Sequence, residues 1–104
     1  MVPELSAQDF LKNVFRKRDE VVSREIAGEM LLVPIKGKLA DMQRIFSLNP
    51  VAAQVWNRLD GTRNLAMVIE GVLERFDVDR SQAEKDVREF LKELLEAGLI
   101  EVVG

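Results

Sequence analysis

At Asn49-Pro50 the spacing of apolar residues changes from that of a strand to that of a helix, and this change constrains the fold more than any other feature of the sequence. In the preceding segment, Met42–Leu48, the apolar Phe46 and Leu48 fall on one face of an extended strand. After it, apolar residues recur at helical spacing, at Val51, Val55, Trp56 and Leu59. Asparagine is a strong N-cap, and a proline in the first helical position loses no hydrogen bond. The sequence therefore predicts a strand followed directly by a helix, which Gly61 is placed to end in a left-handed conformation.

Two further β-rich segments precede this junction, Val21–Ile26 and Glu29–Ile35, with the turn signal Ala27-Gly28 between them. Pro34 cannot donate a ladder hydrogen bond, so we expect it at an edge, at a bulge or at the end of its strand. Together with Met42–Leu48, these segments predict a small meander of three antiparallel strands.

Helical spacing returns in three other parts of the chain. Residues 6–18 (SAQDFLKNVFRKR) predict an amphipathic helix with Ser6 as its cap and a basic, solvated end. Asn64 is predicted to cap a helix that runs to Phe76. The capping-box pattern Ser81-Gln82-Ala83-Glu84 is expected to open a helix that runs to Ala97.

Gly98 is expected to close the last helix, and Leu99–Val103 reads as a short extended tail. The predicted order is thus one helix, three strands, three helices and a tail. With 104 residues the chain has the size of a single domain. We predict an α+β fold of the winged helix-turn-helix type, with a three-stranded antiparallel sheet followed by a three-helix bundle and an extra N-terminal helix.

The composition excludes several classes of function. The chain has no cysteine, no histidine and no tyrosine. A disulfide framework, a thiolate metal site and the usual general base are therefore all absent. We expect a protein without catalytic activity, cofactor or metal. Neither a signal peptide nor an apolar stretch long enough to span a bilayer is recognisable, so we expect a cytoplasmic protein.

Two motifs that could carry chemistry do not meet its requirements. Ser47 stands at a strand-to-helix bend, but a nucleophile elbow needs glycines two residues to either side, where this chain has Ile45 and Asn49. Asp77 and Asp79 lack the further oxygen ligands of a calcium loop and are better explained by a turn and a helix cap.

Nucleic-acid binding is the natural alternative for a winged-helix layout. The helices predicted at 64–76 and 81–97 are, however, net acidic by one and two charges, and the whole chain carries −3. Such surfaces repel phosphate. A winged-helix nucleic-acid-binding or transcriptional accessory protein remains the alternative hypothesis.

The predicted sheet offers a different kind of site, because its third strand has an edge that could accept an extended peptide. Main-chain hydrogen bonds would supply affinity, and pockets for alternate side chains would supply specificity. The edge could instead be closed by the chain's own termini or by a second copy of the domain, which would make the protein a structural dimer.

The run Phe46-x-Leu48-Asn49-x-x-Ala52-x-x-Val55-Trp56-x-x-Leu59-Asp60-Gly61 closely resembles the signature of the pyrroloquinoline quinone biosynthesis protein D (PqqD) family. The spacing to Asp86-Val87 and Phe90-Leu91, the closing Leu94-x-x-x-Gly98-Leu99-Ile100 and the upstream Val22-x-Arg24 match as well. The resemblance covers about residues 20–102. It suggests a PqqD-like winged-helix domain at 20–104, a helical extension at 1–19, and a stand-alone member of the family.

The resemblance implies a peptide chaperone that binds the leader segment of a ribosomally made precursor peptide. Such a protein presents the peptide to a modifying enzyme, commonly a radical S-adenosylmethionine (SAM) protein, and the leader adds along the third strand and packs on the third helix. Carried onto this chain, the peptide-binding residues are Met42, Gln43, Arg44, Ile45 and Ser47 on the strand, and Lys85, Arg88, Leu91, Lys92 and Leu95 on the helix. Arg44, Arg88 and Lys92 would suit an acidic leader.

Overall fold

The computed structural model describes residues 7–36 and 44–103. In chain order the elements are α1 (Ala7–Lys12), β1 (Val14–Lys17), β2 (Val21–Ile26), β3 (Glu29–Pro34), β4 (Phe46–Leu48), α3 (Pro50–Asn57), β5 (Asp60–Asn64), α4 (Leu65–Arg75), α5 (Arg80–Glu96) and β6 (Ile100–Val103). They form an α+β fold with two antiparallel sheets, which confirms the predicted class.

The larger sheet is the predicted meander, in the order β2-β3-β4. The hairpin β2–β3 turns at Ala27 and Gly28, which both have positive φ. Its register pairs Val21 with Pro34, so the proline stands at the end of its strand, as expected. The third strand is shorter than predicted, because only Phe46–Leu48 pairs with β3. Met42 and Gln43, at the start of the predicted strand, lie outside the described residues.

A second sheet, β5-β1-β6, was not predicted. Its central strand is Val14–Lys17, so the prediction of one helix over 6–18 is wrong in its second half. The apolar spacing there is helical, but a short helix gains little from its own hydrogen bonds, so tertiary pairing can override the local pattern. Pairing on both sides decides the matter, since β1 meets β6 from Val14 to Lys17 and β5 on the other edge.

The helix termini follow the sequence closely, with two corrections. The side chains of Asn49 and Asn64 accept hydrogen bonds from Ala52 N (2.8 Å) and Met67 N (2.9 Å), as predicted caps do. The capping box at 81–84 is wrong, because Asp79 caps α5 by accepting from Gln82 N. Gly61 has the expected positive φ of 84° but lies inside β5, beyond the end of α3 at Asn57.

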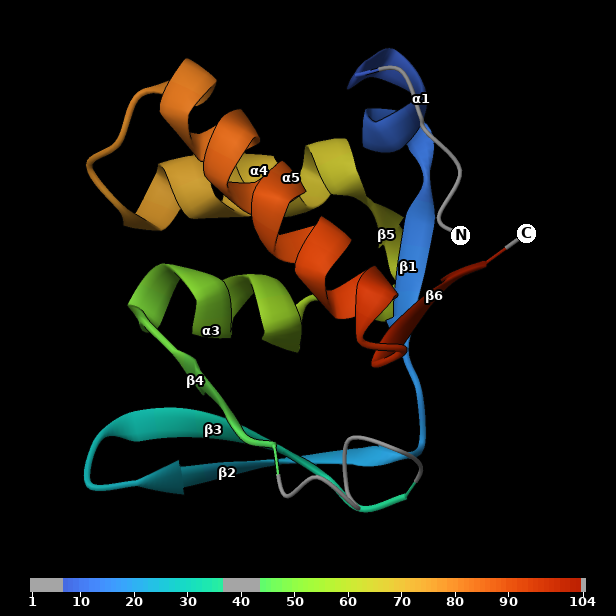
Figure 1. Cartoon of the computed structure of the whole chain (residues 1–104). Coiled ribbons are helices and arrows are strands. Elements are labelled where there is room, and N and C mark those ends of the chain that lie inside the picture. Colours follow the sequence, from blue (N-terminus) through green and yellow to red (C-terminus); the bar gives the residue numbers. More distant parts are fainter. Residues whose placement is uncertain (1–6, 37–43, 104) are drawn as a thin grey trace.

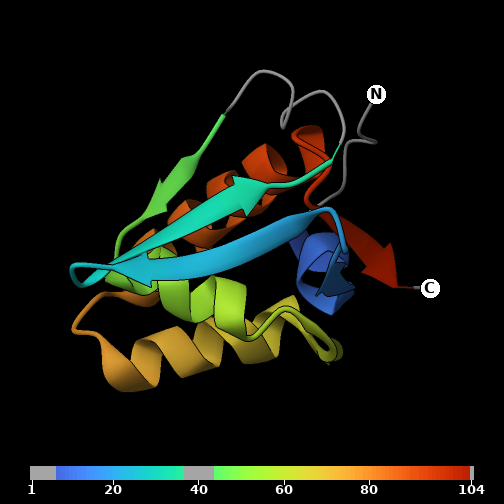
Figure 2. The same ribbon diagram turned by 90° about the horizontal axis from the view of Figure 1, so that it is seen from below.

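The core lies between the larger sheet and the helices (Figures 1 and 2). In the view from below, the meander crosses in front of the helix layer, and Trp56 of α3 is only 1% exposed. Phe10 and Phe15 belong to the same core, and their rings lie 5.6 Å apart. The division of the chain at residues 19 and 20 stays a prediction, while the packing joins α1 and β1 to the rest of the fold.

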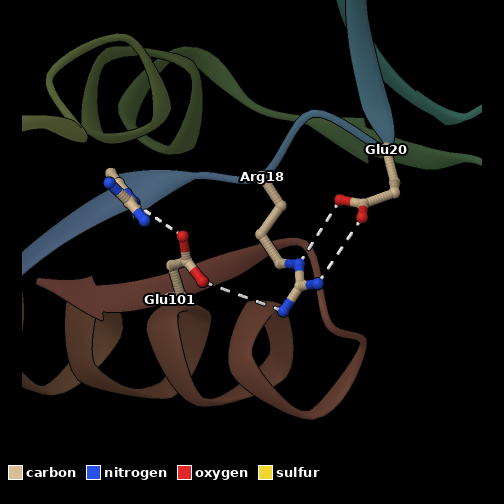
Figure 3. A network of polar contacts seen from close by, with 4 residues as sticks. Arg18, Glu20 and Glu101 are labelled. Atoms are coloured by element: carbon tan, nitrogen blue, oxygen red, sulfur yellow. Dashed lines mark hydrogen bonds and ion pairs between the residues drawn. The ribbon is translucent and has the colours of Figure 1, made fainter.

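Ion pairs fasten the second sheet to the start of β2 (Figure 3). Arg16 Nε lies 2.6 Å from Glu101 Oε1 across the β1–β6 pair. Arg18 Nε lies 3.3 Å from Glu20 Oε2, and its Nη1 is 3.9 Å from Glu101. All of these groups are partly exposed, so each pair stabilises the fold only modestly.

Two carboxylates make the stability depend on pH. The hydrogen bond from Arg18 holds the pKa of Glu20 below its ordinary value, and the hydrogen bond from the Thr62 hydroxyl lowers the pKa of Asp60. A lowered folded-state pKa adds stability above the ordinary pKa, and this stability is lost as the pH falls through the folded value. We expect the urea midpoint to fall between about pH 5 and pH 3. Asp60→Asn should flatten that fall, whereas Glu74→Gln on the exposed face of α4 should leave it unchanged.

Candidate functional site

The strand β4 offers main-chain hydrogen-bonding groups at an open edge. In the described part of the chain it pairs only with β3. Opposite residues of two antiparallel strands alternate between pairs that exchange hydrogen bonds and pairs that do not. Ile35 N donates to Glu20 O at 2.7 Å, so Glu20 and Ile35 form a hydrogen-bonded pair, and this fixes the alternation along β2 and β3. By the same alternation, Phe46 and Leu48 exchange bonds with Leu32 and Met30 of β3. The N–H and C=O of Ser47, between them, therefore point away from the sheet.

Beside this edge lies a cavity of about 440 Å³. Three elements supply most of its lining: β4 with the following Asn49, the first turns of α3, and one face of α5. The lining residues are Phe46, Ser47, Leu48, Asn49, Val51, Ala52, Val55, Val72, Val78, Ala83, Asp86, Val87, Glu89, Phe90 and Glu93. The apolar members form a floor that a side chain of an added strand could cover.

Side chains of β4 hold this edge in position from both faces. Phe46 is half-buried and Leu48 is buried, whereas Ser47 is exposed and its hydroxyl donates to a carboxylate oxygen of Glu29. Just before the strand, the guanidinium carbon of Arg44 lies 5.0 Å from the centre of the Phe46 ring. The arginine therefore lies over the aromatic side chain at the start of the edge.

The helix α5 presents two different polar flanks on either side of its buried stripe. The buried stripe is Ala83, Val87, Leu91 and Leu94. Residues three, four and seven apart share a face of a helix, so Asp86, Glu89 and Glu93 form one flank. Lys85, Arg88 and Lys92 form a separate flank, for the same reason. Only the first of these flanks lines the cavity.

The predicted peptide-binding residues are thus only partly brought together. Ser47 lines the cavity, Arg44 and Ile45 are exposed just before β4, and Met42 and Gln43 lie outside the described residues. On α5, Lys85 and Lys92 are exposed, Arg88 and Leu95 are half-buried, and Leu91 is in the core. None of these five helix residues lines the cavity, so their assignment to the site stays a prediction.

The sequence analysis did not select the residues that line the cavity on α5. Asp86, Glu89 and Glu93 are spaced as one helical stripe, and that signal was available. The spacing alone gave no reason to place this flank, and not the basic one, at the candidate site. The side of α5 that faces β4 becomes known only from the packing.

Metal-ligating side chains and a lysine with a shifted pKa bear on what chemistry the described residues could carry. In residues 7–36 and 44–103 there is no group of three or more metal-ligating side chains that could hold an ion. The Nζ of Lys17 lies 5.5 Å from the centre of the Trp56 ring. Burial lowers the pKa of Lys17, and the nearby Asp60 partly opposes this shift. Lys17 does not line the cavity.

The site and fold together define a small α+β domain with an open strand edge beside a helix-lined groove. The family model described as coenzyme PQQ synthesis protein D (PqqD) matches residues 29–100, which include β3, β4 and α5. The chain belongs to the PqqD family.

Curated relatives and solved structures agree with this assignment. A PqqA binding protein of Rhizobium meliloti is 31% identical over 67% of this chain and 74% of its own length. The PqqA binding protein of Xanthomonas euvesicatoria is 36% identical over 56% of this chain and 63% of its own length. TbiB1 in complex with the TbiA(beta) leader peptide has a TM-score of 0.69 at 26% identity, covering 86% of this chain and 98% of that one. A lasso peptide synthetase B1 complexed with the leader peptide has a TM-score of 0.68 at 25% identity, covering 84% and 96%.

None of the helices in the described segments has the length and apolar character needed to cross a bilayer.

Proposed function

We propose that this protein is a non-catalytic peptide chaperone that binds the leader segment of a precursor peptide by strand addition at β4. It then presents the peptide to a modifying enzyme, such as a radical SAM protein, in the cytoplasm. The observation that carries the proposal is the outward-facing backbone of Ser47 beside an apolar cavity. The names of the curated relatives and the leader-peptide complexes of the two structural neighbours support it.

In the proposed complex the leader pairs with the backbone of Ser47 and continues toward Ile45 and the preceding residues. Alternate side chains of an added strand point to one face, so every second leader residue would lie over the cavity. Phe46, Val51 and Phe90 would then contact an apolar leader side chain. On this reading Trp56 supports the site from the core and does not contact the peptide.

A winged-helix description of the domain goes with this proposal. The helices α3, α4 and α5 pack on one another, and the meander β2–β4 precedes them in the chain. The winged-helix alternative function, nucleic-acid binding, is disfavoured by the three carboxylates of α5 that line the cavity.

The test is a titration of the isotope-labelled protein with short precursor peptides encoded beside its gene. We expect the amide signals of Ser47 and its neighbours, and those of α5 near Phe90, to shift together. Absence of any shift with every neighbouring peptide would contradict the proposal. Salt-dependent binding to random duplex DNA would favour the nucleic-acid alternative. A mass that doubles with concentration in light scattering, with β4 protected, would favour a dimer that closes its own edge.

A further inference from the structure

The groove is the cavity between β4 and α5 described above. Among the residues that the structure describes, its charged lining side chains are three carboxylates, those of Asp86, Glu89 and Glu93. These residues are exposed on one flank of α5, where they rim the apolar floor. Lys85, Arg88 and Lys92 of the same helix lie on the other flank, away from the cavity. Arg44 does not line the cavity and lies at the start of the β4 edge, over the ring of Phe46. The groove therefore offers a guest peptide an apolar floor bounded by negative charge.

We propose, resting on the function proposed above, that the leader recognised by this groove is basic, with a lysine or arginine two residues from an apolar side chain. The apolar side chain covers the floor at Phe46 and Phe90, and the cation reaches the stripe of Asp86, Glu89 and Glu93. This is the reverse of the acidic leader that Arg44, Arg88 and Lys92 suggested from the sequence.

The spacing of side chains on α5 and on an added strand sets the sequence pattern expected in the leader. The carboxylates span seven residues of α5, which is about 10 Å at the rise of an α-helix. Side chains on one face of a strand recur every two residues, about 7 Å apart. Two successive guest side chains on the face toward α5 thus fit within the stripe. A long lysine or arginine stem can lie along the apolar floor while its charged end reaches a carboxylate in solvent.

The magnitude expected for each pair is small, because the carboxylates are exposed. An exposed ion pair changes affinity by roughly 2- to 5-fold. The larger consequence is discrimination, since a glutamate at the same guest position would face the stripe with like charge.

The experiment selects binders from a displayed library of random 12-residue peptides on the immobilised full-length protein. Selected peptides are synthesised, and their affinities are measured by fluorescence anisotropy for the wild type and two triple variants. The first variant is Asp86→Asn/Glu89→Gln/Glu93→Gln. The matched control, Asp19→Asn/Glu25→Gln/Glu74→Gln, removes the same number of exposed carboxylates outside the groove. Circular dichroism confirms that both variants are folded.

We expect the selected peptides to carry lysine or arginine two residues from an apolar side chain. The groove variant should bind them about five-fold more weakly, and the control variant should change affinity by less than about two-fold. Peptides that depend on the β4 edge, tested with Ser47→Pro, but that show no basic preference would overturn this inference and leave the proposed function standing. A selection that yields no peptide dependent on the β4 edge would instead overturn the proposed function, and this inference with it.

Discussion

A Ser47→Pro variant should remain folded and lose about 10- to 100-fold in affinity for its leader peptide. The substitution removes the one N–H of β4 that points away from β3, and a carbonyl of the added strand is then buried without a donor. Proline is tolerated on edge strands where the N–H faces solvent, so the pairing of β4 with β3 should survive. Anisotropy of a labelled leader peptide gives the affinity, and urea unfolding gives the stability.

Two substitutions separate the backbone effect from other causes. Ser47→Ala loses the hydrogen bond to Glu29 but keeps the N–H, so it should bind the leader almost as well as the wild type. Phe46→Pro removes an N–H that points inward to β3 and should instead destabilise the fold. Unchanged affinity in the folded Ser47→Pro variant would show that the guest does not pair with β4. Ile45 is two residues before Ser47, so its N–H is expected to point away from β3 as well. Ile45→Pro therefore tests whether the pairing with the guest continues beyond β4.

A Phe15→Ala variant should lower the free energy of unfolding by about 3–5 kcal/mol. Phe15 lies on the central strand of the second sheet, is 1% exposed and packs with Phe10. Its removal leaves a cavity between β1 and the helices that the two flanking strands restrict from collapsing. For a domain whose whole stability is about 5–15 kcal/mol, this loss is large. Urea unfolding followed by circular dichroism measures it.

The neighbouring Arg16→Ala is the control, because Arg16 is exposed and its pair with Glu101 should contribute less than about 1 kcal/mol. A chain that starts at residue 20 is the companion test of the predicted domain division. If residues 1–19 are a separable extension, that chain should unfold at the wild-type urea concentration. Because that chain lacks β1, the central strand of the sheet β5-β1-β6, we expect it to be much less stable than the wild type.

The helix α1 and the strand β1 show why the local pattern of apolar residues was insufficient to predict the secondary structure. Phe10, Leu11, Val14 and Phe15 fit one helix, yet the chain divides after Lys12 into a short helix and a strand. In this arrangement Phe10 and Phe15 are buried, whereas Leu11 and Val14 are half-buried. The strand β5, with the sequence DGTRN, has little intrinsic strand preference and forms because β1 lies beside it.

The strand of the candidate site was predictable from the sequence, and the side of α5 that lines the cavity was not. Alternation in the segment before Asn49 identified the strand, and the signature around Trp56 identified the family, as the match over 29–100 confirms. On α5 the structure places Val87, Leu91 and Leu94 in the core. The peptide-binding residues predicted on this helix, Lys85, Arg88, Leu91, Lys92 and Leu95, stay a prediction. The cavity is lined by the acidic flank instead.

The sequence by itself determined the local elements that short-range chemistry controls. The caps at Asn49 and Asn64, the turn at Ala27-Gly28 and the left-handed Gly98 all depend on residues a few positions apart. The tertiary structure decided which strands joined into which sheet and which flank of α5 faces the open edge. Both depend on contacts between residues far apart in the chain. A helix with a polar flank on each side of its buried stripe satisfies its own sequence equally well in either orientation, until β4 and α3 pack against one side of it.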